Sequence, residues 1–201
     1  PEIRLLQQLV RHLEDLTQTR QQAKNRLGLP GQSEPVTDHL QAQITLLDQQ
    51  IAYTKQAITD LLNQHPDLKR QKDLLRSIPG LGDLTIGKLI AECRDLTTFR
   101  DVRQLVAFAG LNPRHHTSGS SVHKKPSISR TGSAALRAAL YMPALTAMRF
   151  NPLLRAFADR LRSRGLSGKA IVVAVMRKLL HLVFGVLKSG QPFDPHWHSA
   201  S

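Results

Sequence analysis

The chain has 201 residues, of which 41% are hydrophobic and 4% aromatic, so it is not generally disordered and lacks a rich supply of aromatic platforms for stacking bases. Its single cysteine, Cys93, excludes a disulfide framework and a cysteine-based zinc site, and it predicts a cytoplasmic protein. The formal net charge of +13 lies in the second half: residues 1–101 carry 13 Lys/Arg and 13 Asp/Glu, whereas residues 102–201 carry 15 Lys/Arg and two acids.

Residues 1–65 have the apolar spacing of two long helices. The seam residues are Leu6, Leu9, Leu13 and Leu16, followed by Leu40, Ile44, Leu47, Ile51, Ile58 and Leu61. A turn-rich segment at 28–35 separates the two stretches, and Asp38 is a candidate N-cap of the second helix. We predict a long antiparallel coiled-coil hairpin. Because one hairpin leaves so narrow a seam half covered, we expect a homo-oligomer formed through the coiled coil, or docking on another domain.

Residues 66–189 show the spacing of shorter helices in a compact domain. The helices are expected at 67–77, 83–93, 101–109, 133–148, 152–163 and 168–188. No strand periodicity appears, so the predicted fold class is all-α without a sheet. The apolar run at 170–187 is interrupted by Arg177, Lys178 and His181, so no membrane contact is expected. Residues 190–201 are expected to form a disordered tail.

The segment IPGLGDLTIGKLI at 78–90 has the spacing of a helix-hairpin-helix element. Gly80 and Gly82 would let the backbone approach a phosphate, and Lys88 would add a charge beside the next helix N-terminus. An ordinary helix–helix turn is the alternative, because it uses glycine for the same backbone reason.

Residues 111–132 form a long connection that contains five serines, three histidines, four basic residues and no acid. Loops of this length inside a compact domain are usually functional or disordered. The excess of positive charge in residues 102–201 predicts a polyphosphate partner such as a nucleic acid. The predicted contacts are Arg114, Lys124, Lys125, Arg130 and Arg137. A metal site is not predicted, since adjacent histidines such as His115 and His116 rarely chelate together and no carboxylate is near.

Four stretches in this order carry a resemblance to a known family. They are SIPGLG (77–82), FRDVRQLVAFAGLNP (99–113), Thr117-Ser118-Gly119 and ISRTGSAALRAALYMPALTAMRFNP (128–152). The chain resembles the C-terminal domain of the insertion-sequence-110 transposases, a family also named after insertion sequences 116 and 902. The earlier helical stretch, with Arg20 and the segment 24–27, is similar to the central coiled coil of that family.

The resemblance implies a bacterial, nucleoid-associated recombinase that moves an insertion element, acts on DNA and is helped by a structured bridge RNA. It implies that Ser118 is the nucleophile, and Ser120 and Ser121 are the alternative candidates. In that family a ribonuclease-H-like domain holds divalent metal, such as Mg, on a DEDD acidic set. This sequence lacks such a domain, so we expect no cofactor in this chain and little activity from the chain alone. Because it begins at Pro1 without methionine, we expect that a preceding segment has been removed.

Two other functions fit part of the sequence. One is a non-enzymatic architectural protein that binds nucleic acid through the helical hairpin and the basic domain. The other is an endonuclease or repair factor with a helix-hairpin-helix module, which does not account for Ser118-Gly119 or the ISRTGS stretch.

Overall fold

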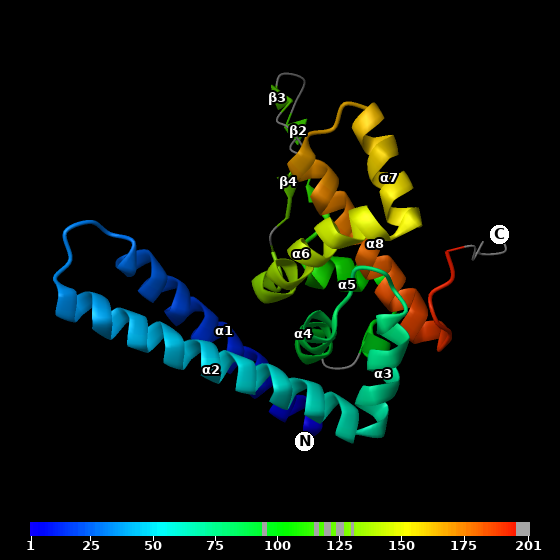
Figure 1. The fold of residues 1–201 in the computed structure, drawn as a ribbon. Coiled ribbons are helices and arrows are strands. Elements are labelled where there is room, and N and C mark those ends of the chain that lie inside the picture. The colour runs from blue at the N-terminus through cyan, green and yellow to red at the C-terminus, as the bar shows by residue number, and fades with distance from the viewer. Residues whose placement is uncertain (94–95, 115–116, 119–121, 124–126, 130, 196–201) are drawn as a thin grey trace, which may run out of the picture. The chain divides into compact units, whose positions relative to one another are not determined.

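The computed structural model describes residues 1–93, 96–114, 117–118, 122–123, 127–129 and 131–195 (Figure 1). The chain divides into two compact units, unit 1 from Pro1 to Lys69 and unit 2 from Arg70 to Ser201. Helices make up nearly all the regular structure in the described residues, which confirms the helical part of the prediction. The expectation that no sheet is present is wrong, because two short antiparallel ladders occur.

Unit 1 is the predicted pair of long helices, α1 (Glu2–Leu27) and α2 (Glu34–Gln64), which pack along each other (Figure 1). The second helix begins five residues earlier than expected, with Ser33 rather than Asp38 at the N-cap position. The seam of α1 also differs at one position, because Val10 is buried and Leu9 is only half-buried. In α2, Leu62 is buried in place of the predicted Leu61, which is only half-buried. The other eight of the ten predicted seam residues are buried as expected.

The apolar seam of unit 1 is covered within the hairpin itself. Leu13 is 4% exposed and Ile44 is 5% exposed. Near the turn, Ala23, Leu40 and Ile44 form a buried cluster with Leu27 against it. The reason given above for self-association, a half-covered seam, is therefore wrong, and self-association stays a prediction without that support.

Unit 2 is a set of shorter helices. They are α3 (Pro66–Arg76, which begins in unit 1), α4 (Asp83–Cys93), the 3-10 helix η1 (Leu96–Thr98), α5 (Val102–Phe108), α6 (Ala134–Phe150), α7 (Pro152–Ser163) and α8 (Gly168–Ser189). Each α-helix ends within two residues of the predicted range.

Helix α8 is the core helix of unit 2, and it contacts α5, α6, α7 and η1 (Figure 1). Its buried residues recur every three or four positions, as a helix buried on one broad face requires. They are Ile171, Val172, Val175, Met176, Leu179, Leu180, Val183 and Val186. By length and composition alone, α8 is also the one helix of the described residues that is apolar enough to cross a membrane.

Outside the helices, four two-residue segments pair in two antiparallel ladders, which the sequence analysis did not predict. They are β1 (Pro113–Arg114), β2 (Thr117–Ser118), β3 (Val122–His123) and β4 (Ser127–Ile128). β1 pairs with β4, and β2 pairs with β3. Of the predicted tail, residues 196–201 lie outside the described residues. Before them the Phe193 N–H donates to Ser77 Oγ at 2.7 Å.

Candidate active site on the hairpin of residues 113–128

The four short strands form the arms of one hairpin between α5 and α6. In the outer ladder Pro113 pairs with Ile128. In the inner ladder Thr117 pairs with His123 and Ser118 pairs with Val122. The backbone of Ser118 therefore lies in the inner ladder, in the last described pair before residues 119–121.

The base of the hairpin is tied to α5 by backbone hydrogen bonds. The Ser129 N–H donates to the Asn112 carbonyl oxygen at 2.9 Å, directly beyond the outer ladder. One residue before Asn112, the Leu111 N–H donates to the Val106 carbonyl oxygen at 3.0 Å. Gly110 supports this turn at the end of α5 with a φ of 65°. Both arms thus start from fixed backbone positions.

Gly132 holds the second arm against α5. Its φ is +129°, a conformation that L side chains rarely adopt. A Cβ atom added there would lie within 3.0 Å of the carbonyl oxygens of Phe108 and Ala107. The next residue, Ser133, donates its N–H to the Phe108 carbonyl oxygen at 2.8 Å. Only glycine allows this close passage of one backbone over the other.

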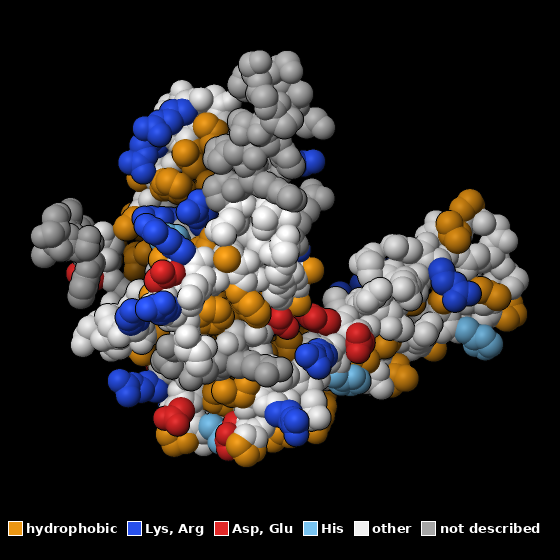
Figure 2. Space-filling model, turned by 180° about the vertical axis from the view of Figure 1, so that it is seen from behind, with side chains coloured by type: hydrophobic (Ala, Val, Ile, Leu, Met, Phe, Trp, Pro, Cys, Tyr) orange, Lys and Arg blue, Asp and Glu red, His pale blue; other side chains and the backbone are white. Residues whose placement is uncertain are grey.

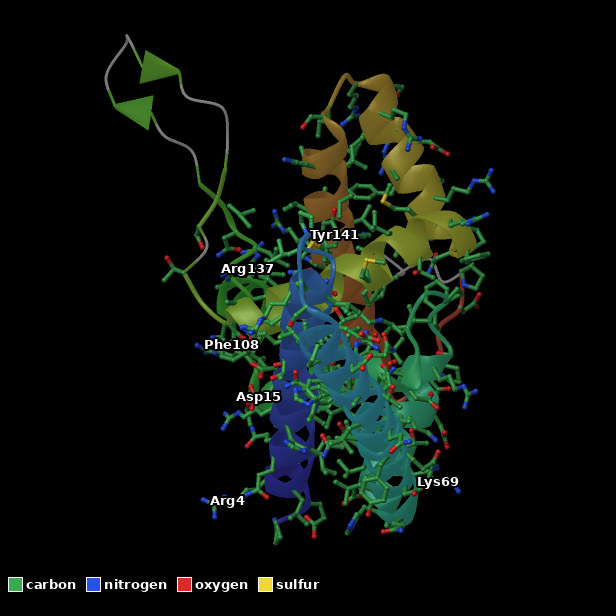
Figure 3. The ribbon with its side chains drawn as sticks, turned by 60° about the vertical axis from the view of Figure 1, so that its left-hand side comes forward. Arg4, Asp15, Lys69, Phe108, Arg137 and Tyr141 are labelled. Atoms are coloured by element: carbon green, nitrogen blue, oxygen red, sulfur yellow. The ribbon has the colours of Figure 1, made fainter. Side chains whose placement is uncertain are left out.

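Ser133 and Arg137 fix the start of α6 beneath the hairpin. Ser133 Oγ accepts from the Leu136 N–H at 3.0 Å as the N-cap, and it donates to Glu92 Oε2 on α4 at 2.8 Å. Arg137 Nη1 donates to the carbonyl oxygens of Ala109 at 3.0 Å and Gly132 at 3.4 Å. Figure 3 shows Arg137 on α6 close to Phe108 at the end of α5. The hairpin therefore stands on a base made from α4, α5 and α6.

The structure brings several of the predicted site residues to this hairpin. Ser118 and Arg114 lie on β2 and β1, with their backbones described. Lys124, Lys125 and Arg130 lie outside the described residues, as do Ser120 and Ser121. Arg137 lies at the base, where its guanidinium donates to two backbone carbonyls, and its contact with nucleic acid stays a prediction.

The predicted helix-hairpin-helix residues lie elsewhere, between α3 and α4. Gly80 has a φ of +107°, and a Cβ atom there would lie 2.7 Å from Ala147 Cβ, so the close approach that it permits is to α6. The start of α4 carries Asp83, whose carboxylate lies 3.7 Å from Arg76 Nη1. A carboxylate at this position competes with a phosphate for the helix N-terminus. Phosphate contact at this turn stays a prediction.

The two other predicted residues of this turn have different surroundings. Gly82 precedes α4, and no heavy atom that the structure describes lies within 4 Å of a Cβ atom added there. Lys88 is half-buried on α4.

Cys93 is not a competing nucleophile. It lies at the end of α4, and burial raises the pKa of its thiol to about 12. At neutral pH the group is therefore a thiol and not the reactive thiolate. In the described part of the chain, no three His, Cys, Asp or Glu residues are grouped so that they could hold a metal ion.

Sequence reasoning missed the residues that build the base of the hairpin. Ser133 had a usable signal, because a serine directly before an apolar helix is a typical N-cap. Its second partner, Glu92, lies 41 residues earlier in the chain, and no local pattern joins the two. Gly132 was included in the ISRTGS stretch, but its contact with α5 has no sequence signature.

Comparison with known proteins shows a family to which the sequence of this region is similar. Residues 72–159, which include the hairpin and its base, match the family described as transposase IS116/IS110/IS902. The pilin gene-inverting protein of Moraxella bovis is 38% identical over 161 residues, which cover 80% of this chain and 48% of that protein. The 43.6 kDa protein of insertion element IS110 from Streptomyces coelicolor is 29% identical over 164 residues, covering 82% of this chain and 39% of that protein.

A further relative is named as a transposase. The transposase for insertion sequence element IS1111A of Coxiella burnetii is 31% identical over 118 residues, covering 59% of this chain and 31% of that protein. The chain thus spans about half the length, or less, of the curated relatives that it matches.

Proposed function

We propose, since the chain belongs to the IS116/IS110/IS902 transposase family, that it is the DNA-binding C-terminal part of a transposase that recombines an insertion element through the nucleophile Ser118. The observation that carries this proposal is the hairpin. It holds the Ser118 backbone in a ladder pair with Val122, and its base is fixed to three helices. A nucleophile on this ladder is carried by a segment whose base is fixed to the helical domain.

The proposed reaction exchanges one phosphoester for another. Ser118 Oγ attacks a DNA phosphorus, an Oγ–P bond forms, and the P–O bond to the leaving deoxyribose oxygen breaks. A base takes the serine proton, and the leaving oxygen receives one. The candidate bases are His115, His116 and His123, of which His123 pairs through its backbone with Thr117, one position from Ser118.

Positive charge supplies the second requirement of this chemistry, because the pentacovalent phosphorus carries added negative charge. From Val102 to Ala158 the sequence has eight basic residues and no acid. Arg114 lies on the hairpin, and Lys124, Lys125 and Arg130 belong to the same segment. We propose that these residues bind the DNA backbone around the scissile phosphate.

The remaining partners are proposed from the family resemblance. A ribonuclease-H-like domain would hold a divalent metal such as Mg, and a structured bridge RNA would select the DNA. Joining such a domain to this chain tests the enzymatic proposal: a covalent protein–DNA adduct is expected. If the extended protein binds DNA without any adduct, the architectural function would be the better explanation.

DNA binding by the chain is expected to depend steeply on salt. If about six phosphates are neutralised, log K should fall against log salt with a slope near −5, because each contact releases condensed counterions. Fluorescence anisotropy with a labelled duplex, titrated at several NaCl concentrations, measures this slope. A slope near zero would remove the electrostatic part of the proposal.

A further inference from the structure

A second basic surface lies at the other end of α6, in a groove between that end and α7. Its volume is about 600 Å³. It is lined by Leu145, Met148, Arg149, Phe150, Arg155, Ala158, Asp159 and Arg162. Figure 2 shows Lys and Arg side chains beside hydrophobic ones over the α7 part of unit 2. The single acid of this groove, Asp159, is paired with Arg162 at 2.5 Å, so the lining keeps a net positive charge.

The turn that shapes this groove is rigid. Asn151, between α6 and α7, is fully buried. Its Oδ1 accepts from the N–H groups of Leu153 at 3.1 Å and Leu154 at 3.2 Å, which caps α7. Phe150 and Arg155 therefore project from backbone that the cap holds in place, one before the turn and one after it.

The groove combines cations with exposed apolar surface. Phe150 is 62% exposed, and the guanidinium carbon of Arg149 lies 5.5 Å from its ring centroid. Leu145 is 36% exposed. The arginines alone would be enough to bind phosphate groups, and the exposed ring adds a surface that a phosphate does not use. An exposed ring beside a guanidinium plane suits an unpaired nucleobase, which stacks on both kinds of surface. A duplex keeps its bases stacked inside and offers the groove phosphates alone.

We infer that this groove binds an unpaired nucleic-acid strand, with a base stacked at Phe150 and Arg149 and with phosphates at Arg155 and Arg162. The guanidinium of Arg162 has further N–H donors beside the one that meets Asp159. The site goes beyond the proposed function, because it uses no part of the Ser118 hairpin. Helix α6 has 17 residues, so the groove and the base of the hairpin at Ser133 lie about 25 Å apart along its axis.

The test compares single-stranded and duplex probes on the full chain. The single-stranded probe is a labelled oligothymidylate of about 12 nucleotides, and the second is a duplex of equal length. Phe150→Ala is expected to weaken binding of the single strand by about 5- to 100-fold and to leave duplex binding within about twofold. Replacing Arg155 and Arg162 together by glutamine should make the salt slope for the single strand shallower by about 1.4.

Two matched variants on unit 1 control for lost aromatic surface and lost charge. Tyr53→Ala removes a ring that is 78% exposed on α2, and replacing Arg4 and Arg11 together by glutamine removes two exposed charges on α1. Neither should change binding of the single strand, and thermal unfolding of every variant should match the parent chain. Equal losses for both probes in Phe150→Ala would show that no base is stacked there.

The same variants distinguish a nucleic-acid site from a site that binds a second protein chain. Unchanged single-strand binding, combined with altered sedimentation of the groove variants, would show that the groove contacts a second protein chain and that the inference is wrong. The outcome of this test does not depend on Ser118, because no residue of the 113–128 hairpin lines the groove.

Discussion

Replacing Gly132 by alanine is expected to destabilise unit 2 by about 2–6 kcal/mol, a large part of the stability of an ordinary domain. Two costs add at this position. A side chain at a φ of +129° strains the backbone by about 1–3 kcal/mol. The new Cβ atom must also move the carbonyl oxygens of Phe108 and Ala107, which belong to a helix end and cannot rotate away. Overpacking of this kind costs about 1–3 kcal/mol.

Urea unfolding followed by circular dichroism measures this loss, and two other glycines separate its causes. Gly165 has a φ of +76° with nothing within 4 Å of an added Cβ, so Gly165→Ala should cost only about 1–2 kcal/mol. Gly82 has neither feature, and Gly82→Ala should change stability by less than about 0.5 kcal/mol. If Gly132→Ala cost no more than Gly165→Ala, the close passage over α5 would not be a structural requirement.

The helices could be predicted from the sequence because their signals are local. The buried residues of α8 recur at helical spacing, and the Asn151-Pro152 pair marks the boundary between α6 and α7 by capping one helix and starting the next. The hairpin of unit 1 was predicted for the same reason. Its buried seam was misjudged because coverage depends on how closely α1 and α2 approach, and a periodic pattern does not contain that distance.

The candidate site could be predicted only in part. The ladders of the hairpin are two residues long, too short for strand alternation to appear, and their register shifts by one residue between Arg114–Ser127 and Ser118–Val122. The resemblance selected Ser118, but it did not reveal what fixes the hairpin to the helices. That base depends on contacts between distant residues, such as Ser133 with Glu92. The groove at Phe150 was missed because a low aromatic content says nothing about where a single exposed ring lies.

Replacing Ser118 by alanine is expected to abolish the covalent protein–DNA adduct in a protein extended to the full length of its relatives. The loss should be at least about 1000-fold, because no other group takes over when the attacking atom is removed. DNA affinity should change by less than about threefold, since one hydroxyl contributes little beside the basic residues of the same segment. Denaturing gel electrophoresis of a labelled DNA substrate measures the adduct, and anisotropy measures the affinity.

Neighbouring serines and the hairpin base provide the controls for this experiment. Ser120→Ala and Ser121→Ala should each keep the adduct, because they retain the Ser118 hydroxyl. Ser133→Ala removes the N-cap and the bond to Glu92, so it should lower the adduct yield through a loosened hairpin while the remaining adduct still maps to Ser118. An unchanged adduct in Ser118→Ala, or its loss in Ser120→Ala or Ser121→Ala alone, would assign the nucleophile to a different hydroxyl. Peptide mapping of the DNA-linked fragment identifies the attacking hydroxyl directly, because it shows which serine is bonded to the DNA.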